Sequence, residues 1–272
     1  MLSLRNIITT FFLISLLFTC YGLDDPLPVG ARAAGMSSAS VAHADIWSIY
    51  NNQAGLSKIE NLTLAFYNDN KFIKELGTKS IVLGLPTNSG TFGVSVSSTG
   101  IPDANFQKFG IAYGKTLGEK FSAGLQFEYL RISQPLNYGN DGAFTFELGI
   151  ISNPIQNFFI GFHVFNPVQA KYLRQDDEKI YTLIKGGMEY HFSEKAIIAI
   201  ETEKDLKYSP NYKIGCEYNF YKNLNFRLGI STNPVNYSFG LGFIVYNVFA
   251  DVAFTLHNEL GLIPHISFSY AF

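Results

Sequence analysis

The feature that most constrains this chain is a two-residue alternation of apolar and polar side chains, which starts near residue 61 and continues to the end. Between residues 121 and 129, for example, Phe, Ala, Leu, Phe and Tyr alternate with Ser, Gly, Gln and Glu. Successive side chains of a strand point to opposite faces, so this pattern predicts strands that each carry one apolar face. No helical period interrupts the pattern, and the sequence predicts an all-β fold from residue 61 onward.

The number and length of these strands favour a membrane barrel. Many of them are about ten residues long, whereas strands of globular proteins are usually about 5–6 residues long. About ten residues is also the length that a tilted strand needs to cross a bilayer. The alternation predicts about fourteen strands, near 61–67, 78–86, 91–98, 107–115, 120–131, 143–152, 158–166, 179–191, 194–204, 211–221, 223–231, 236–244, 248–257 and 265–272.

The connections between the predicted strands alternate in length. Those after odd strands tend to be long (68–77, 99–106, 132–142, 167–178), and those after even strands are short (87–90, 116–119, 192–193, 222, 245–247). Bacterial outer-membrane barrels have short periplasmic turns and longer outer loops in this way. An even strand count also places both termini on the periplasmic side.

The two faces of the strands are compatible with two folds. In a soluble sandwich the apolar face would form the core, and in a membrane barrel it would meet lipid. Only 15% of the residues are charged and another 15% are aromatic, against about 25% charged residues in an ordinary globular protein. Together with strand length and loop asymmetry, this composition favours an antiparallel transmembrane β-barrel over residues 61–272.

Most strand charges lie on the polar face, which lines the lumen of a barrel. We expect an inward-facing charged network, with Lys185 nearby, that could line a cation-favouring pore or anchor a plug. The simpler alternative is that these charges hydrate or brace a closed lumen, as the polar interior of any such barrel does, and this alternative is favoured. The predicted network comprises Glu201, Lys213, Glu217, Arg227 and Asp251.

The N-terminus resembles an export signal. Arg5 precedes an apolar stretch over 7–18, and the small residues Cys20 and Gly22 suit a cleavage site after Gly22. Residues 1–22 are therefore expected to be a cleaved signal peptide. Lipidation at Cys20 is the alternative, and the stretch is short for an uncleaved anchor, which needs about 20 residues.

Residues 23–60 differ from the strands that follow. The segment over 31–50 is rich in Ala and Ser, with Ile46, Trp47 and Tyr50 at helical spacing. We expect a short helical plug inside or beneath the barrel, and a loosely held periplasmic tail is the alternative. The candidate plug residues are Trp47, Asn51, Asn52 and Gly55.

The last strand has an aromatic outer face that resembles the signal recognised by the barrel-assembly machinery. Its candidate residues are Ile266, Phe268, Tyr270 and Phe272. The alternative is an aromatic strand that merely ends the chain. An unpaired strand of this kind would be an aggregation hazard, so we expect residues 265–272 to pair with the first strand near 61–67 and close the barrel.

Other function classes find little support in the sequence. The net charge of −2 lacks the basic surplus of a nucleic-acid binder. A catalytic triad around His163 or His257 can be imagined, but no nucleophile elbow, metal-binding spacing or phosphate loop accompanies these histidines. We expect no enzymatic activity and no cofactor, and Cys216 should be an inert thiol on the outer face.

Three strings of the sequence resemble one known family. VGARAAGM at 29–36, ADIWSIYNNQAGL at 44–56 and the C-terminal HNELGLIPHISFSYAF at 257–272 are similar to the PorV/PorQ-like outer-membrane barrels of Bacteroidetes, distant relatives of the FadL-type fatty-acid channels. The broader FadL-related pattern has Asn-Pro-Ala-Gly-Leu where this chain has Gln53 in place of Pro. That departure and the shorter chain resemble a short-chain branch of the family.

The resemblance implies a fourteen-strand outer-membrane barrel and two functions. The first is an accessory of the type IX secretion apparatus or a close paralogue, with a secretion component as partner. The alternative is a FadL-like passive channel for small hydrophobic solutes, which would enter past Phe106, Tyr138 and Tyr172 in the outer loops. Membrane lipid and the barrel-assembly machinery are expected partners in either case.

Overall fold

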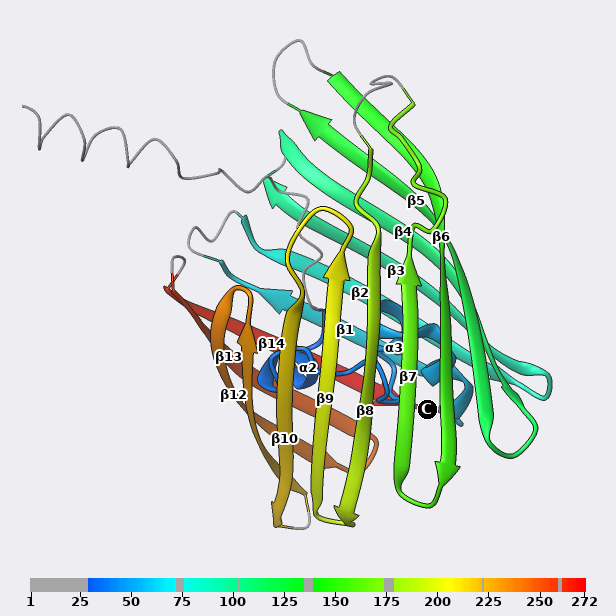
Figure 1. The fold of residues 1–272 in the computed structure, drawn as a ribbon, viewed down its shortest axis with the longest axis vertical. Coiled ribbons are helices and arrows are strands. Elements are labelled where there is room, and N and C mark those ends of the chain that lie inside the picture. The colour runs from blue at the N-terminus through cyan, green and yellow to red at the C-terminus, as the bar shows by residue number, and fades with distance from the viewer. Residues whose placement is uncertain are drawn as a thin grey trace, which may run out of the picture.

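The protein is a closed antiparallel barrel of fourteen strands (Figure 1). The computed structural model describes residues 29–71, 76–101, 103–134, 139–173, 179–221, 223–258 and 261–272. The predicted signal peptide, including Cys20, lies outside these residues, as does Tyr138. The strands are β1 (Thr63–Asp69), β2 (Thr78–Thr87), β3 (Gly90–Ile101), β4 (Ala104–Leu117), β5 (Phe121–Gln134), β6 (Gly139–Ile155), β7 (Phe158–Phe165), β8 (Leu183–Ser193), β9 (Ala196–Asp205), β10 (Asn211–Tyr221), β11 (Leu224–Thr232), β12 (Val235–Val245), β13 (Val248–His257) and β14 (Gly261–Ala271).

Each strand pairs with its neighbours in sequence, and the first and last strands close the ring. Strand β1 pairs with β14 in a register that runs from Thr63 opposite Ala271 to Asp69 opposite His265. The predicted strand count, antiparallel order and closing pair are therefore confirmed. Closure removes the exposed sheet edge that a flat fourteen-strand sheet would have.

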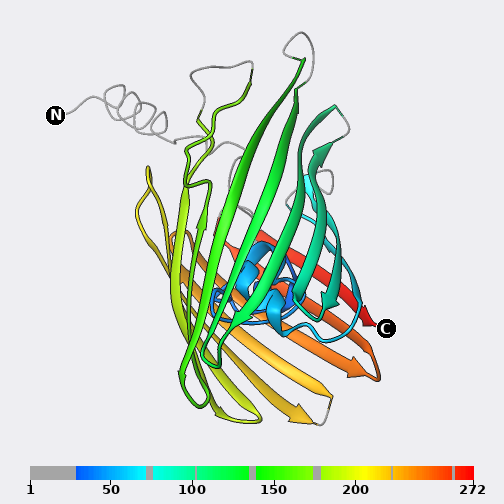
Figure 2. The ribbon, with the colours of Figure 1, turned by 90° about the vertical axis from the view of Figure 1, so that its right-hand side faces the viewer.

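The predicted difference in loop length is only partly correct. Strands β3 and β4 continue to Ile101 and from Ala104, so the expected long loop over 99–106 is mostly paired strand. The expected loop over 132–142 likewise contains paired strand residues, since Ser133 is opposite Asn140. The strand backbones thus stay hydrogen-bonded beyond the residues whose side chains alternate between apolar and polar. The hairpin β5–β6 extends beyond the other strands (Figure 2).

The longest connection in the described structure is the β7–β8 loop, which joins Phe165 to Leu183. Strand β8 begins at Leu183 instead of the expected residue 179. Asn166 fixes the base of the loop: its amide donates to the carbonyls of Ile180 and Tyr181, both at 3.1 Å. These bonds draw the chain after residue 178 over the end of the barrel before it enters the strand.

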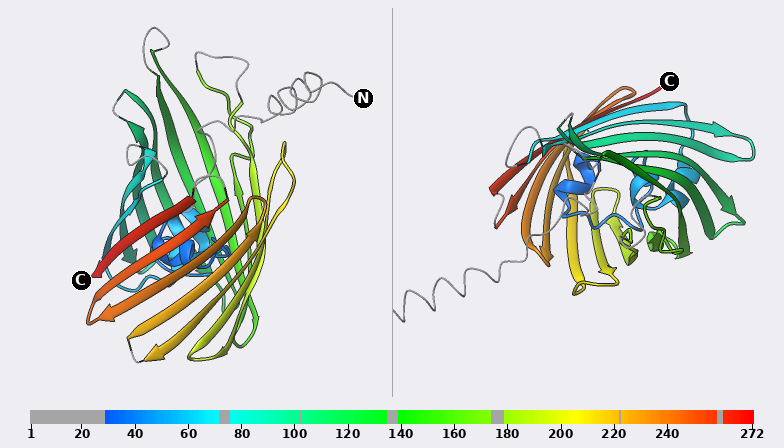
Figure 3. Two further views of the ribbon diagram at one scale, coloured as in Figure 1. Left: turned by 90° about the vertical axis from the view of Figure 1, so that its left-hand side faces the viewer. Right: turned by 90° about the horizontal axis from the view of Figure 1, so that it is seen from above.

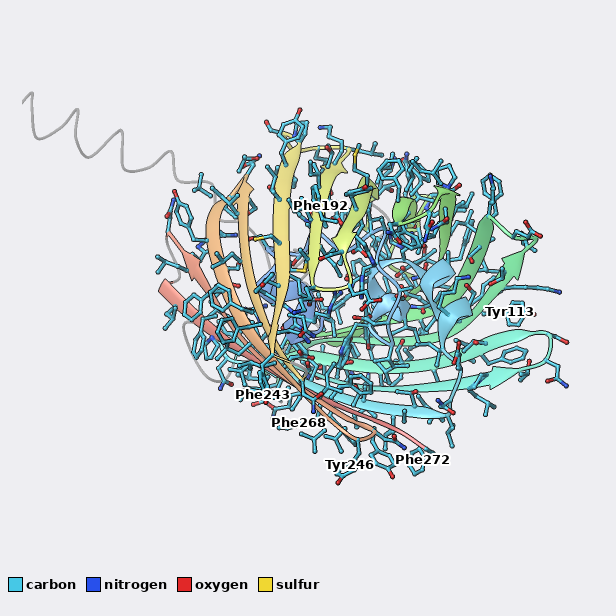
Figure 4. All side chains as sticks on the ribbon, turned by 90° about the horizontal axis from the view of Figure 1, so that it is seen from below. Tyr113, Phe192, Phe243, Tyr246, Phe268 and Phe272 are labelled. Carbon is cyan, nitrogen blue, oxygen red and sulfur yellow. The ribbon has the colours of Figure 1, made fainter. Side chains whose placement is uncertain are left out.

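The outer surface of the barrel is apolar on every side. Phe226, Leu228 and Ile230 of β11 are 40–45% exposed, and Phe243, Phe268 and Phe272 project from the outside of the wall (Figure 4). Inward neighbours such as Ser267 are buried. A sandwich would bury its apolar face, so the structure excludes that alternative.

A helical segment lies within the ring of strands (Figure 3). It contains α2 (Ala31–Gly35), α3 (Ser48–Asn51) and the 3₁₀ helix η1 (Gln53–Lys58). The short N-terminal helical plug is thereby confirmed, although only the two ends of the stretch 31–50 are helical. Ser37 and Ser38 adopt positive φ angles of 49° and 62°, which end the first helix and turn the chain across the lumen. Among the described residues, no helix is both long and apolar enough to span a membrane.

Candidate functional site

A belt of inward-facing glycines receives the plug. On ten strands a Cβ atom added to such a glycine would collide with plug atoms or press closely against them. At Gly124 it would strike the backbone of Gln53 and Ala54, and at Gly161 the backbone of Val41. The glycine belt consists of Gly84, Gly93, Gly114, Gly124, Gly149, Gly161, Gly187, Gly215, Gly229 and Gly240.

Several members of the belt face one another across neighbouring strands. Gly114, Gly124 and Gly149 are directly opposite on β4, β5 and β6, as are Gly161 and Gly187 on β7 and β8. The absence of side chains at this level lets the plug backbone approach the wall. The plug is consequently fitted to the lumen over most of its circumference.

Asn52, one of the predicted plug residues, binds three parts of the molecule. Its amide donates to the carbonyl of Val41 at 2.6 Å within the plug and to the carbonyl of Ile150 on β6 at 3.1 Å. It also donates to Phe162 on β7 at 3.3 Å, and its oxygen caps η1 by accepting from Ala54. Asn52 is fully buried, so its bonds replace those that water would otherwise supply.

The other predicted plug residues shape the segment from within. Trp47 is buried and contacts the ring of Tyr67 edge-on, with 5.9 Å between centroids. Asn51 ends α3 and is buried. A Cβ at Gly55 would collide with Ser48, so this glycine permits η1 to pack closely against α3.

Three of the predicted lumenal charges join a plug arginine that the sequence analysis missed. Arg32 donates to both carboxylate oxygens of Glu217, at 2.9 and 3.0 Å. Arg227 also binds Glu217 and contacts Asp251 at 2.6 Å. We call these four residues the arginine cluster. Burial acts to lower the pKa of Arg32, but the carboxylates of Glu217 and Asp45 outweigh it and raise this pKa, so the guanidinium stays charged.

The remaining two predicted charges form a second cluster farther around the wall. The ammonium of Lys213 lies 3.1 Å from Glu201 and 2.8 Å from Glu203. Glu201 also accepts from the backbone N–H groups of Ser40 and Val41 in the plug, at 2.9 and 2.8 Å. The five residues predicted as one network thus fall into two groups, and each group binds the plug.

A third group of charges, the Lys108 cluster, was not predicted as a unit. It contains Lys108, Gln126, Glu128, Glu147 and His163. The ammonium of Lys108 is 2.7 Å from Glu128 and 2.6 Å from Glu147. His163 contacts Glu147 at 2.8 Å.

Gln53 connects the Lys108 cluster to the plug. Its amide donates to Glu147 at 2.5 Å and to the carbonyl of Ile49 at 3.0 Å. Proline, which the family pattern has at this position, carries no side-chain donor that could make these bonds. Gln53 therefore makes contacts with Glu147 and Ile49 that a proline at this position could not make.

An apolar cluster occupies the lumen beyond these charges. Along β5 the inward positions pass from Gly124 of the belt, through Gln126 and Glu128, to Leu130 and Ile132. The cluster comprises Leu130, Ala143, Phe165, Tyr172, Ile180 and Leu183, with Phe106, Ile132, Ala170 and Tyr181 packed against it.

The β7–β8 loop contributes one side of this apolar cluster. Tyr172 and Ile180 come from the loop and are each 3% exposed. Tyr172 thus lies in a loop, as expected, but it packs into the lumen. Phe106 was expected in an outer loop and instead lies on β4 and packs against the cluster, because that strand extends to Ala104.

The described residues contain no group of three or more His, Cys, Asp or Glu side chains placed to hold a metal ion. Cys216 is a free thiol on the outer face of β10.

Comparison with known proteins gives a clear result for the fold alone. No protein-family model and no curated protein sequence matches the chain. The structure is similar to the toluene transporter TodX of P. putida, with a TM-score of 0.69 and 10% identity over 89% of this chain and 98% of that one. The structure is also similar to the toluene transporter TbuX of Ralstonia pickettii, with a TM-score of 0.67 and 10% identity over 89% of this chain and 98% of that one. A FadL homologue of Pseudomonas aeruginosa gives a TM-score of 0.61 at 10% identity over 90% and 99%.

Proposed function

We propose that this protein is an outer-membrane channel for small apolar solutes. The observation that carries the proposal is the apolar cluster inside the lumen, formed by wall residues and the β7–β8 loop. The interior of a transmembrane barrel is normally polar, whereas sites for small ligands are lined mostly by apolar and aromatic side chains. A small apolar molecule could replace loop side chains such as Tyr172 and Ile180 against Leu130.

The similar structures support this choice between the two functions expected from the sequence. They are described as toluene transporters and a FadL homologue, and they have the same barrel architecture. They lend no support to the PorV/PorQ assignment or to an accessory role in type IX secretion. For the partners, we propose membrane lipid around the apolar exterior and the barrel-assembly machinery at the last strand.

Uptake by whole cells tests the channel. Cells that produce the protein should take up radiolabelled toluene faster than cells with an empty vector. Leu130→Asn should reduce this gain about tenfold, because it places an amide among apolar side chains where the amide has no designed partner. Leu130→Met keeps the apolar volume and should retain most of the uptake. An equal rate in producing and empty cells would end the proposal.

A single outward-facing substitution tests the membrane location. Phe226→Arg should destabilise the barrel by about 2–4 kcal/mol if this position lies near the bilayer midplane, because the guanidinium would face hydrocarbon. Phe226→Leu should have little effect. Urea unfolding in lipid vesicles, followed by the far-UV circular dichroism of the strands, measures both variants, and equal stability of the two would contradict a lipid-facing Phe226.

A further inference from the structure

We infer that the preferred solute is an apolar molecule that carries a hydrogen-bond donor, such as a phenol, an alcohol or an amine, and that carboxylates are excluded. The inference rests on the proposed channel function and specifies its substrate class. It comes from the Lys108 cluster, which lies between the plug and the apolar cluster.

The Lys108 cluster and the apolar cluster are in contact. Lys108 is directly opposite Leu130 across β4 and β5, and Leu130 is opposite Ala143 on β6. The ammonium of Lys108 also lies 4.9 Å from the ring centroid of Phe165, which belongs to the apolar cluster. A solute held against Phe165 and Leu130 would thus have its deeper end at the Lys108 cluster.

The cation of this cluster is already paired. Lys108 contacts Glu128 at 2.7 Å and Glu147 at 2.6 Å, and its side chain is 14% exposed. An incoming carboxylate could bind Lys108 only as a third acidic group on its remaining N–H donor, or by displacing Glu128 or Glu147 and leaving that carboxylate buried without its cation. Leaving a buried charge uncompensated is strongly unfavourable.

The polar atoms without partners in the cluster are oxygen acceptors and one ring nitrogen. Oε2 of Glu128 and Oε1 of Gln126 are buried and have no hydrogen-bond partner, and the same holds for Oε1 of Gln53 in the adjoining plug. Nδ1 of His163 is in the same state. A buried acceptor without a donor is unfavourable, so a solute that supplies an O–H or N–H group gains a bond that a plain hydrocarbon cannot make.

The balance of charge leads to the same substrate class. Glu128 and Glu147 share the one ammonium group of Lys108. A further carboxylate would bring a third acidic group to this single cation, while a neutral donor or an ammonium group would not. Selection here therefore depends on repulsion of the wrong solute as well as on attraction of the right one.

Three matched ligands test the inference. The protein in nanodiscs is dialysed against radiolabelled 4-ethylphenol, ethylbenzene or 4-ethylbenzoate, with empty nanodiscs as the blank for partition into lipid. We expect 4-ethylphenol to bind about tenfold more tightly than ethylbenzene, and 4-ethylbenzoate to show no saturable binding. Equal binding of the phenol and the hydrocarbon, or saturable binding of the benzoate, would overturn the inference and leave the channel standing. If none of the three binds, the proposed function itself fails.

A variant identifies the residue responsible. Glu128→Gln leaves Lys108 paired with Glu147 and replaces one carboxyl oxygen of residue 128 by an N–H donor, so 4-ethylphenol should lose most of its advantage and 4-ethylbenzoate should begin to bind. Glu119→Gln, in the exposed turn between β4 and β5, removes a carboxylate far from the lumen and should reproduce the unmodified protein. An unchanged ligand order in Glu128→Gln would contradict the assignment to this cluster.

Discussion

Removal of Ser269–Phe272 is expected to abolish assembly of the barrel. This deletion removes the pairs that Thr63, Leu64 and Ala65 of β1 make with β14, together with the bond from the Phe272 N–H to the Leu62 carbonyl at 2.8 Å. In hydrocarbon each unpaired backbone group costs several kcal/mol. The sum exceeds the usual stability margin of about 5–15 kcal/mol. Heat-modifiable migration on gels and protease resistance in isolated outer membranes measure the effect.

Two further variants separate ring closure from recognition by the assembly machinery. Ser269→Ala keeps every backbone pair and should assemble normally. Phe272→Ala also keeps the strand but removes the terminal aromatic ring, so a slower rate of assembly with a normal final product would assign that ring to recognition. A truncated chain that still migrated as a compact, protease-resistant species would contradict closure through β1 and β14.

Gly161→Leu is expected to displace the plug. The added side chain would occupy the place of the Val41 backbone, and the adjoining Glu201 bonds to Ser40 and Val41 would be lost. Overpacking of this kind costs about 1–3 kcal/mol when neighbours can adjust, and here the plug can move more easily than the wall. We expect a higher single-channel conductance in planar bilayers and faster proteolysis within residues 36–47.

A matched control lies on the neighbouring strand. Gly186 faces outward, and a Cβ there would meet only the ring of Phe162, at 4.0 Å. Gly186→Leu therefore adds the same side chain to the other side of the wall and should leave conductance unchanged. If both substitutions raised the conductance equally, contact with the glycine belt would not be what holds the plug in place.

Local periodicity was sufficient to predict the strands but not their ends. Alternation predicts which residues face outward because each strand contacts two different environments, and Ile266 and Phe268 are exposed as expected. The ends of β3 to β6 are held by backbone hydrogen bonds, which form even where the side chains on both faces are polar. Ser133 and Asn140 are one such pair. No apolar pattern marks those residues, and the sequence suggested loops there.

The lumenal site could be predicted only in outline. Charges on the polar face identified Glu217 and Arg227, but their partner Arg32 is 185 residues from Glu217 in the chain. No periodic pattern connects positions so far apart. The glycine belt left a visible sign, since Gly124, Gly149 and Gly161 occupy polar-face positions of predicted strands. Their role can be recognised only when the position of the plug in the lumen is known.

The fit between plug and wall restricts how this protein can change over evolutionary time. Barrel diameter grows with strand number. The gain of one hairpin would therefore move the glycines of the belt away from the plug backbone, and the loss of one would push them into it. Helix α2 contacts β12 and β13, while η1 contacts β4 and β5 on another part of the ring. A descendant with twelve or sixteen strands would need a rebuilt segment 29–58 at the same time, whereas loops that do not pack into the lumen could diverge freely.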